Sequence, residues 1–303
     1  MSPRVLFAGC AGLPEGDGDE AAVPAELAAL GIDAGWAAWD DPDVDFAAAD
    51  LVVLRATWDY APRRAEFLEW CASLGNLRNH AAVARWNTDK RYLADLSAAG
   101  VPTVPTTLVE PGLNVTWPAG EFVVKPAVRA GSRGAARFAA DEHGHADKHL
   151  VTLHADGHTA LVQPYQSHVD SEGETALVFF GGEYSHAFTK GAMLTGSELD
   201  GSGLYVSERL GVARPESAAR ELADKALDAA AGLLGTARAD LLYARVDVVR
   251  MADGSFAVLE LELTEPSLGF RYADPGAAAR FAHCVRNVLD GADDGAPVAG
   301  GAP

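Results

Sequence analysis

The sequence predicts an α/β protein of two or three structural lobes. Its 303 residues can bury a substantial core and exceed the usual size of one domain. The first 80 residues alternate short apolar segments with helix-like segments, which is typical of a small α/β layer. From Glu121 onwards the pattern changes to β-hairpins, which indicates a second kind of lobe.

Hydrophobic patterning places the secondary structure elements along the chain. A helix is expected from Thr88, which can act as its N-cap, to Ala99, and Gly100 ends it. Residues 291–303 contain too few apolar side chains to order themselves, so we expect a disordered tail. The expected strands are 5–8, 51–54, 122–126, 135–139, 160–162, 175–180 and 184–189, with a hairpin at 244–263, and the other expected helices are 21–30, 63–74, a short one after 141, 215–234 and 275–289.

Composition and charge exclude several classes of partner. The net charge of −19 disfavours nucleic acid and anionic membranes, because the overall field repels phosphates. No apolar run reaches the about 20 residues that cross a bilayer, and the N-terminus lacks the apolar core of a signal peptide. Cys10, Cys71 and Cys284 are odd in number and lack metal-ligand spacing, which indicates reduced thiols in the cytoplasm. Composition allows an oligomer.

An acidic hairpin is the strongest chemical signal in the sequence. The segment YARVDVVRMADGSFAVLELEL contains Asp253-Gly254, a two-residue type I′ turn signal between alternating strands. This turn sets Asp247 opposite Glu260 and Arg245 opposite Glu262 on one face of the ribbon. The opposite face is expected to be core and contains Val246, Val248, Leu259, Leu261 and Leu263.

Carboxylates that face each other across two strands repel, which costs up to roughly 1 kcal/mol even in water. A hard divalent cation that accepts oxygen ligands from Asp247, Glu260 and Glu262 removes this repulsion. The alternative is a solvated acidic face on an acidic protein. The neighbouring Arg245 and the apolar reverse face favour the cation site.

This hairpin resembles the metal-binding hairpin of the ATP-grasp superfamily, which includes D-alanine-D-alanine ligase and glutathione synthetase. The matching motifs are Arg245-Val246-Asp247 and Glu260-Leu261-Glu262, with Glu262 where asparagine is commoner. Three upstream segments resemble family segments in the same order, and such order is more specific than any one motif. They are Trp86-Asn87-Thr88-Asp89-Lys90 followed by Gly100-Val101-Pro102, Phe122-Val123-Val124-Lys125-Pro126, and Leu161-Val162-Gln163-Pro164-Tyr165.

The resemblance implies a nucleotide site. Lys125 would contact the phosphates, Lys90 of the entry segment would belong to the nucleotide-binding residues, and Asp170 or Glu174 would contact the ribose. The turn 129–134 would cradle a phosphate with backbone N–H groups. Taken singly, a Gly-rich turn is more often only a hairpin turn, and a strand lysine is ordinarily solvated. The further nucleotide-binding candidates are Arg129, Gly131, Ser132 and Gly134 in the turn, and Gln163, Pro164 and Tyr165 around the adenine.

Other segments resemble a bacterial subgroup that includes the cyclo-ligase closing the cycloserine ring from an O-ureido-serine. They are Leu54 to Tyr60, Gly173-Glu174, Ser185 to Lys190 and Glu265-Pro266-Ser267-Leu268. Arg55 could hold a substrate carboxylate and Asp59 an amine, although a buried ion pair with aromatic packing explains them equally well. The other substrate-binding candidates are Trp58, Tyr60, His186, which shares a strand face with Lys190, and Ser267.

The resemblance implies an ATP-grasp fold with a Rossmann-like N-terminal domain (1–85), a lid or central subdomain (86–163) and a C-terminal antiparallel-sheet catalytic subdomain (164–290). The implied activity is ligation with ATP and one or two Mg²⁺ ions, for which Mn²⁺ can substitute. A small-molecule carboxylate becomes an acyl phosphate and an amine attacks it, including intramolecular cyclo-ligation of an amino-acid derivative in specialised metabolism. Lys125, Lys190 and Arg245 would stabilise the transferring phosphoryl group. The alternatives are a phosphotransferase acting on a small molecule and a non-catalytic nucleotide-binding protein.

Overall fold

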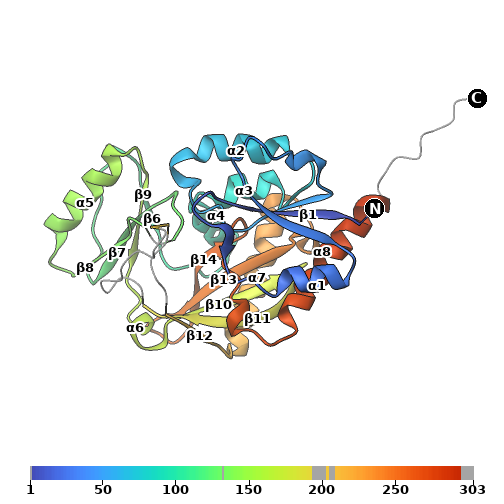
Figure 1. Ribbon diagram of the computed structural model, residues 1–303. Coiled ribbons are helices and arrows are strands. Elements are labelled where there is room, and N and C mark those ends of the chain that lie inside the picture. Colours follow the sequence, from blue (N-terminus) through green and yellow to red (C-terminus); the bar gives the residue numbers. More distant parts are fainter. Residues whose placement is uncertain (1, 132, 193–202, 205–208, 295–303) are drawn as a thin grey trace, which may run out of the picture.

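The computed structural model describes residues 2–131, 133–192, 203–204 and 209–294. Within these residues the strands form three β-sheets, of which the first is parallel and the other two are antiparallel. In Figure 1 the green lobe that carries α5 lies to one side of the other two sheets. The four-stranded sheet of this lobe is therefore separate from the other two sheets.

The N-terminal sheet has the strand order β3-β1-β4-β5. Because side chains alternate along a strand, its two faces bury different residues. Leu6 and Ala8 of β1 pack with the residues of α2, whereas Val5 and Phe7 pack with those of α1 and α8. The elements of this part are β1 (Arg4–Gly9), β2 (Pro14–Asp17), α1 (Val23–Ala29), β3 (Asp33–Ala38), η1 (Phe46–Ala48), β4 (Leu51–Leu54), η2 (Ala61–Arg63), α2 (Arg64–Ser73) and β5 (Leu77–Arg78).

The central lobe is a four-stranded sheet with the order β6-β9-β7-β8. Helix α5 covers one face, where Phe122, Val124 and Leu150 share a core. Alternation then directs Val123 and Lys125 to the opposite face, which is the face towards the cavity. The elements are β6 (Thr107–Val109), β7 (Phe122–Pro126), β8 (Ala136–Phe138), α5 (His143–Ala155) and β9 (Ala160–Pro164).

The C-terminal sheet has the order β12-β11-β10-β13-β14 and is buried on both faces. Helix α7 covers one face, and α8 with part of the N-terminal sheet covers the other. The remaining elements are α3 (Ala81–Asn87), α4 (Tyr92–Ala98), α6 (His168–Glu172), β10 (Glu174–Phe180), β11 (Glu183–Lys190), β12 (Leu210–Val212), α7 (Ser217–Leu234), η3 (Arg238–Asp240), β13 (Tyr243–Arg250), β14 (Phe256–Glu262), η4 (Phe270–Tyr272) and α8 (Ala277–Asp294).

The structure differs from the expected elements in a few places. Thr88 is not an N-cap but the residue that ends α3, and its hydroxyl donates to the carbonyl of Ala84. The following helix begins only at Tyr92, while Gly100 ends it as expected with a φ of 81°. The patterning also missed β3, where small residues weaken the apolar signal. Helix α8 extends into the expected tail as far as Asp294.

The packing of α4 concerns the predicted domain boundary at residue 86, and the domain limits stay a prediction. Tyr92, Leu93 and Leu96 of α4 share a core with α7 and the C-terminal sheet, and this core also includes Leu161 of the central lobe. Helix α4 therefore contacts the C-terminal sheet although the predicted boundary groups it with the central lobe. Among the described residues, no helix combines the length and apolar character that crossing a membrane needs.

Candidate active site

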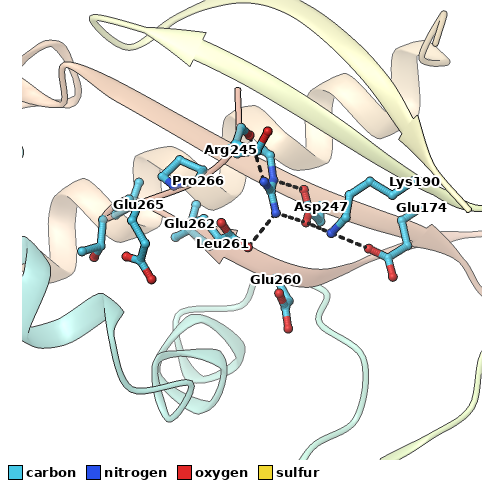
Figure 2. Close-up of polar contacts among 12 residues, drawn as sticks. Glu174, Lys190, Arg245, Asp247, Glu260, Leu261, Glu262, Glu265 and Pro266 are labelled. Carbon is cyan, nitrogen blue, oxygen red and sulfur yellow. Dashed lines mark hydrogen bonds and ion pairs between the residues drawn. The ribbon is translucent and has the colours of Figure 1, made fainter. Parts of the chain in front are cut away.

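The acidic hairpin is formed by β13 and β14, and its register at the acids is the predicted one. Asp247 pairs with Glu260 and Arg245 with Glu262. Carboxylate oxygens of Asp247, Glu260 and Glu262 all lie within 4.8 Å of one another. Figure 2 shows the side chains of this cluster around Arg245 and Lys190. The spacing is close enough for the three carboxylates to share one cation.

The turn of this hairpin is not the predicted two-residue turn. Met251 pairs with Ser255 through its N–H, and Gly254 adopts a φ of 85°, so the loop contains three residues. A β-bulge between Asp247 and Val248 offsets the extra residue and restores the register at the acids. Leu259 is consequently not part of the core face but lines a cavity.

Four cationic side chains from several elements surround the acids. Lys190 of β11 lies 2.9 Å from Asp247 and 3.1 Å from Glu174. Arg245 donates to both oxygens of Asp247, at 2.9 and 3.0 Å, and to Glu262 at 2.6 Å (Figure 2).

The other two cations come from outside the C-terminal sheet. Lys125 of β7 donates to Glu260 at 2.8 Å, and Lys90 lies 4.0 Å from the same carboxylate. A lysine of the central lobe therefore reaches the acids of the C-terminal sheet.

These contacts divide the acids into two classes. Burial disfavours the charged form of Glu260, but Lys125, Lys90 and Lys190 outweigh it and lower its pKa below the usual range. Asp247 behaves in the same way because Arg245 and Lys190 lower its pKa against the effect of burial. For Glu262 and Glu174, burial and the neighbouring carboxylates keep the pKa raised despite Arg245 and Lys190. An added divalent cation would stabilise the charged form of the second class.

A cavity of about 380 Å³ lies between the central lobe and the C-terminal sheet. Both lobes and the N-terminal part contribute to its wall. The predicted residues that line it are Trp58, Tyr60, Lys90, Lys125, Arg129, Gly131, Gln163, Pro164, Tyr165, Glu174, Lys190, Arg245, Glu260, Glu262 and Ser267. The sequence thus identified most of the polar wall.

The turn after β7 reaches the cavity only in part. Gly131 has a φ of 65° and lines the cavity, as does Arg129, whose buried Nε has no hydrogen-bond partner in the described structure. Such an orphan donor suits an anionic ligand. Gly134 packs towards Pro126 and is not part of the wall, and Ser132 lies outside the described residues.

The structure separates the two acids proposed for the ribose. Glu174 lines the cavity and pairs with Lys190. Asp170 lies outside the cavity wall, where it accepts hydrogen bonds from Tyr165 and Arg137. Glu174 is therefore the acid that the fold presents to a ligand.

Three candidates for substrate binding are engaged elsewhere. Arg55 is 1% exposed and donates to Glu20 and to the carbonyl of Pro266, which is the ion-pair alternative. Asp59 accepts from Trp39 and Arg63 rather than facing the cavity. Neither Arg55 nor Asp59 lines the cavity.

The third of these candidates, His186, shares the strand face of Lys190 but is buried. It donates from Nε2 to the carbonyl of Leu268 at 2.7 Å. It therefore holds the backbone that follows Ser267, and a strand face alone could not distinguish this position from the cavity.

Sequence reasoning gave no role to several residues of the wall, notably Arg271, Asp17 and Glu265, which it named only as part of a subgroup motif. Glu265 follows Glu262 by three residues. This closeness in sequence to a metal-ligand candidate was the signal that could have identified it as a site residue. Asp17 and Arg271 are far apart in the sequence and gave no such signal. Arg271 donates to the carbonyl of Asp17 at 3.0 Å, which brings the N-terminal part to the cavity.

Comparison with known proteins identifies the chain. The sequence pattern of the N-terminal domain of D-cycloserine synthetase DcsG matches residues 5–82. The chain is 41% identical over 274 residues to the cycloserine biosynthesis protein DcsG of Streptomyces lavendulae, a match that covers 86% of this chain and 90% of that protein. The chain belongs to the DcsG family.

Solved structures agree with this membership. The crystal structure of D-cycloserine synthetase DcsG superimposes with a TM-score of 0.83 at 36% identity and covers 94% of this chain and 99% of that one. D-alanine–D-alanine ligase from Bacillus anthracis shares the fold, with a TM-score of 0.65 at 15% identity and coverage of 96% and 99%. The predicted ATP-grasp fold is confirmed, and this DcsG-family protein is an ATP-grasp ligase that forms C–N bonds.

Proposed function

We propose that this DcsG-family ligase uses ATP and Mg²⁺ to activate the carboxylate of an amino-acid derivative for intramolecular attack by a nitrogen. The relatives are described as cycloserine biosynthesis proteins, which makes ring closure of a serine derivative the favoured reaction. The observation that carries the proposal is the cluster of Asp247, Glu260 and Glu262 within 4.8 Å, facing cations from two lobes.

The donor set suits a hard cation. All three carboxylates offer oxygen, which Mg²⁺ prefers, and Mn²⁺ has the same preference and should substitute for it. Asp247, Glu260 and Glu262 would hold Mg²⁺, which would supply positive charge to offset that of the nucleotide phosphates. Burial, together with the charges of Asp247 and Glu260, raises the pKa of Glu262, and a cation would stabilise its charged form.

The nucleotide would lie between the central lobe and the C-terminal sheet. Val123 and Leu259 line the cavity from these two lobes and offer apolar surfaces for the adenine. Gln163 supplies a polar edge from β9. Lys125 and Lys90, which hold Glu260 in the free protein, would transfer to phosphate oxygens as the cation takes their place.

The reaction has two steps. A substrate carboxylate oxygen takes the γ-phosphoryl group of ATP, which breaks the bond to the β-phosphate and releases ADP. A nitrogen of the same substrate then attacks the acyl carbon and gives up a proton to the solvent, and the bond to phosphate breaks to release inorganic phosphate. Lys190 and Arg245, held beside Asp247, stabilise the negative charge that is spread over the transferring oxygens.

The test is ADP release from O-ureido-D-serine with MgATP, with mass spectrometry of the product. We expect a cyclic product and stoichiometric ADP. Hydroxylamine should divert part of the acyl phosphate to a hydroxamate, which a hydroxyl phosphotransferase would not form. EDTA should abolish turnover, and either Mg²⁺ or Mn²⁺ should restore it. ADP without hydroxamate or cyclic product would support the phosphotransferase alternative, and no ADP release would support the non-catalytic one.

A further inference from the structure

Glu265 is an acid of the cavity that the proposed chemistry does not use. It follows β14, three residues after Glu262, and lines the cavity together with Trp58, Tyr60 and Ser267. The indole N–H of Trp58 donates to the backbone carbonyl of Glu265 at 2.8 Å and fixes this position. The residue therefore belongs to the end of the cavity that the N-terminal part closes.

The acids that β10, β13 and β14 bring to the site already have cationic partners, and the carboxylate of Asp17 accepts the backbone N–H of Asp19. Lys190 pairs with Glu174 and Asp247, Lys125 with Glu260, and Arg245 with Glu262. Glu265 differs from these acids: within the part of the chain that the structure describes, no lysine or arginine forms an ion pair with it. Figure 2 shows its carboxylate directed away from Arg245.

The contact that Glu265 does have is polar but neutral. The Tyr60 hydroxyl interacts with its carboxyl group at the cavity wall. Burial, aided by the charge of Glu262, raises the pKa of Glu265 to about 8. Lys90 and Arg245 act in the opposite direction but do not offset the burial. A cation brought by a ligand would compensate this carboxylate as the lysines compensate the others.

The proposed reaction fixes where a substrate cation would lie. In an α-amino acid derivative, one carbon separates the amino nitrogen from the carboxyl carbon. With the carboxyl group at the cation site of Glu260 and Glu262, the amino group lies within a few ångströms of that site. Asp59, the acid that the sequence suggested for an amine, is already engaged by Trp39 and Arg63.

We propose that Glu265 binds the protonated amino group of the substrate and thereby selects α-amino carboxylates. This inference rests on the proposed function. A nitrogen held as an ammonium ion has no free electron pair and cannot attack the acyl phosphate. Glu265 therefore also reserves the attack for the second nitrogen of the substrate, which closes the ring. It is a specificity residue for the substrate rather than a ligand of the nucleotide.

The experiment compares two substrates across matched variants. The substrates are O-ureido-D-serine and its deamino analogue, 3-(ureidooxy)propanoate, and ADP release with saturating MgATP gives kcat and KM separately. The variants are Glu265→Gln, which keeps the shape and removes the charge, and Glu265→Asp, which keeps the charge. Glu221→Gln, on the exposed side of α7, is the control.

For Glu265→Gln we expect kcat/KM to fall about 10- to 100-fold with the amino substrate, which is the loss typical of a missing hydrogen bond to a charged group. Most of this loss should appear in KM. With the deamino analogue the change should stay below about threefold, because the contact is absent there. The wild type should prefer the amino substrate, Glu265→Asp should retain part of that preference, and Glu221→Gln should match the wild type.

Equal losses with both substrates would overturn the role, because they would indicate a general base or a folding defect. If circular dichroism shows that Glu265→Gln is misfolded, the kinetics of the wild type and of Glu265→Asp test the role instead. A wild type without preference for the amino substrate overturns the role. No turnover of either substrate by the wild type overturns the proposed function and this inference together. Turnover without amino preference overturns only the inference.

Discussion

Lys125 and Glu260 meet across the cavity, with Nζ 2.8 Å from Oε1, although 135 residues separate them in the sequence. The lysine belongs to β7 of the central lobe and the carboxylate to β14 of the C-terminal sheet. This ion pair joins the two walls between which the nucleotide is proposed to bind. Replacing either partner therefore tests both the cation site and the phosphate site.

Glu260→Gln should reduce Mg²⁺-dependent turnover by about 100-fold or more while the fold stays intact, because the amide keeps one oxygen but loses the charge that holds the cation. Magnesium titrations of ADP release measure the effect, and raised Mg²⁺ should recover part of the rate. Glu221→Gln serves again as the control. Unchanged activity with an unchanged Mg²⁺ requirement would end the metal assignment.

Lys125→Met should lower kcat/KM for MgATP by about 100-fold, since it removes a charge aimed at the phosphates during transfer. The methionine fills the same space, so the far-ultraviolet circular dichroism spectrum should not change. Lys148→Met is a matched control in the same lobe, where Lys148 is exposed on α5. Equal kinetics for the two variants would contradict the phosphate role of Lys125.

The stability of the ligand-free protein should depend on Glu265 and pH. Its pKa is about 8 in the folded protein and near 4.5 in the unfolded chain, so the native state binds this proton more tightly. The free energy of unfolding should therefore fall as pH rises from about 4.5 to about 8. Glu265→Gln removes this dependence and should gain stability relative to the wild type over that window. Urea unfolding at pH 5, 6.5 and 8 measures the difference, and a constant difference would contradict the raised pKa.

Asn79 joins the N-terminal part to the C-terminal sheet, and its loss should destabilise the protein. Its amide donates to the carbonyls of Tyr243 and Leu263 and accepts from the N–H of Leu242. Asn79→Ala leaves three buried backbone groups without partners, which should cost about 3 kcal/mol or more. Urea unfolding measures this cost against Asn114→Ala in an exposed loop. A loss below about 1 kcal/mol would show that water replaces the amide.

The hairpin acids could be predicted from the sequence because their relationship is local. Strand alternation puts Asp247, Glu260 and Glu262 on one face, and a tight turn fixes which residues are opposite. The predicted turn was too short by one residue, and a bulge compensated for it. A turn signal alone does not encode such a bulge, because the bulge depends on how the strand packs.

The substrate end of the cavity could not be predicted in this way. Arg55 and Asp59 leave the end of a strand, where ligand residues are common, but their partners decide their roles. Arg55 contacts Pro266, 211 residues away, and Glu20, neither of which its neighbours in the sequence indicate. The same long-range packing places Trp58 against Glu265.

The sequence by itself determined the ATP-grasp family, the acidic pair of strands and the lysines that accompany it, because these depend on periodicity, turn signals and the order of short motifs. The tertiary structure decided which acids lack a cation. Whether an acid is paired depends on the distances among charged side chains of β7, β10, β11, β13 and β14. These strands are separate segments of the sequence, so no single segment determines the pairing. Glu265 became a candidate for substrate recognition only when the acids of β10, β13 and β14 at the site were seen to be paired with cations.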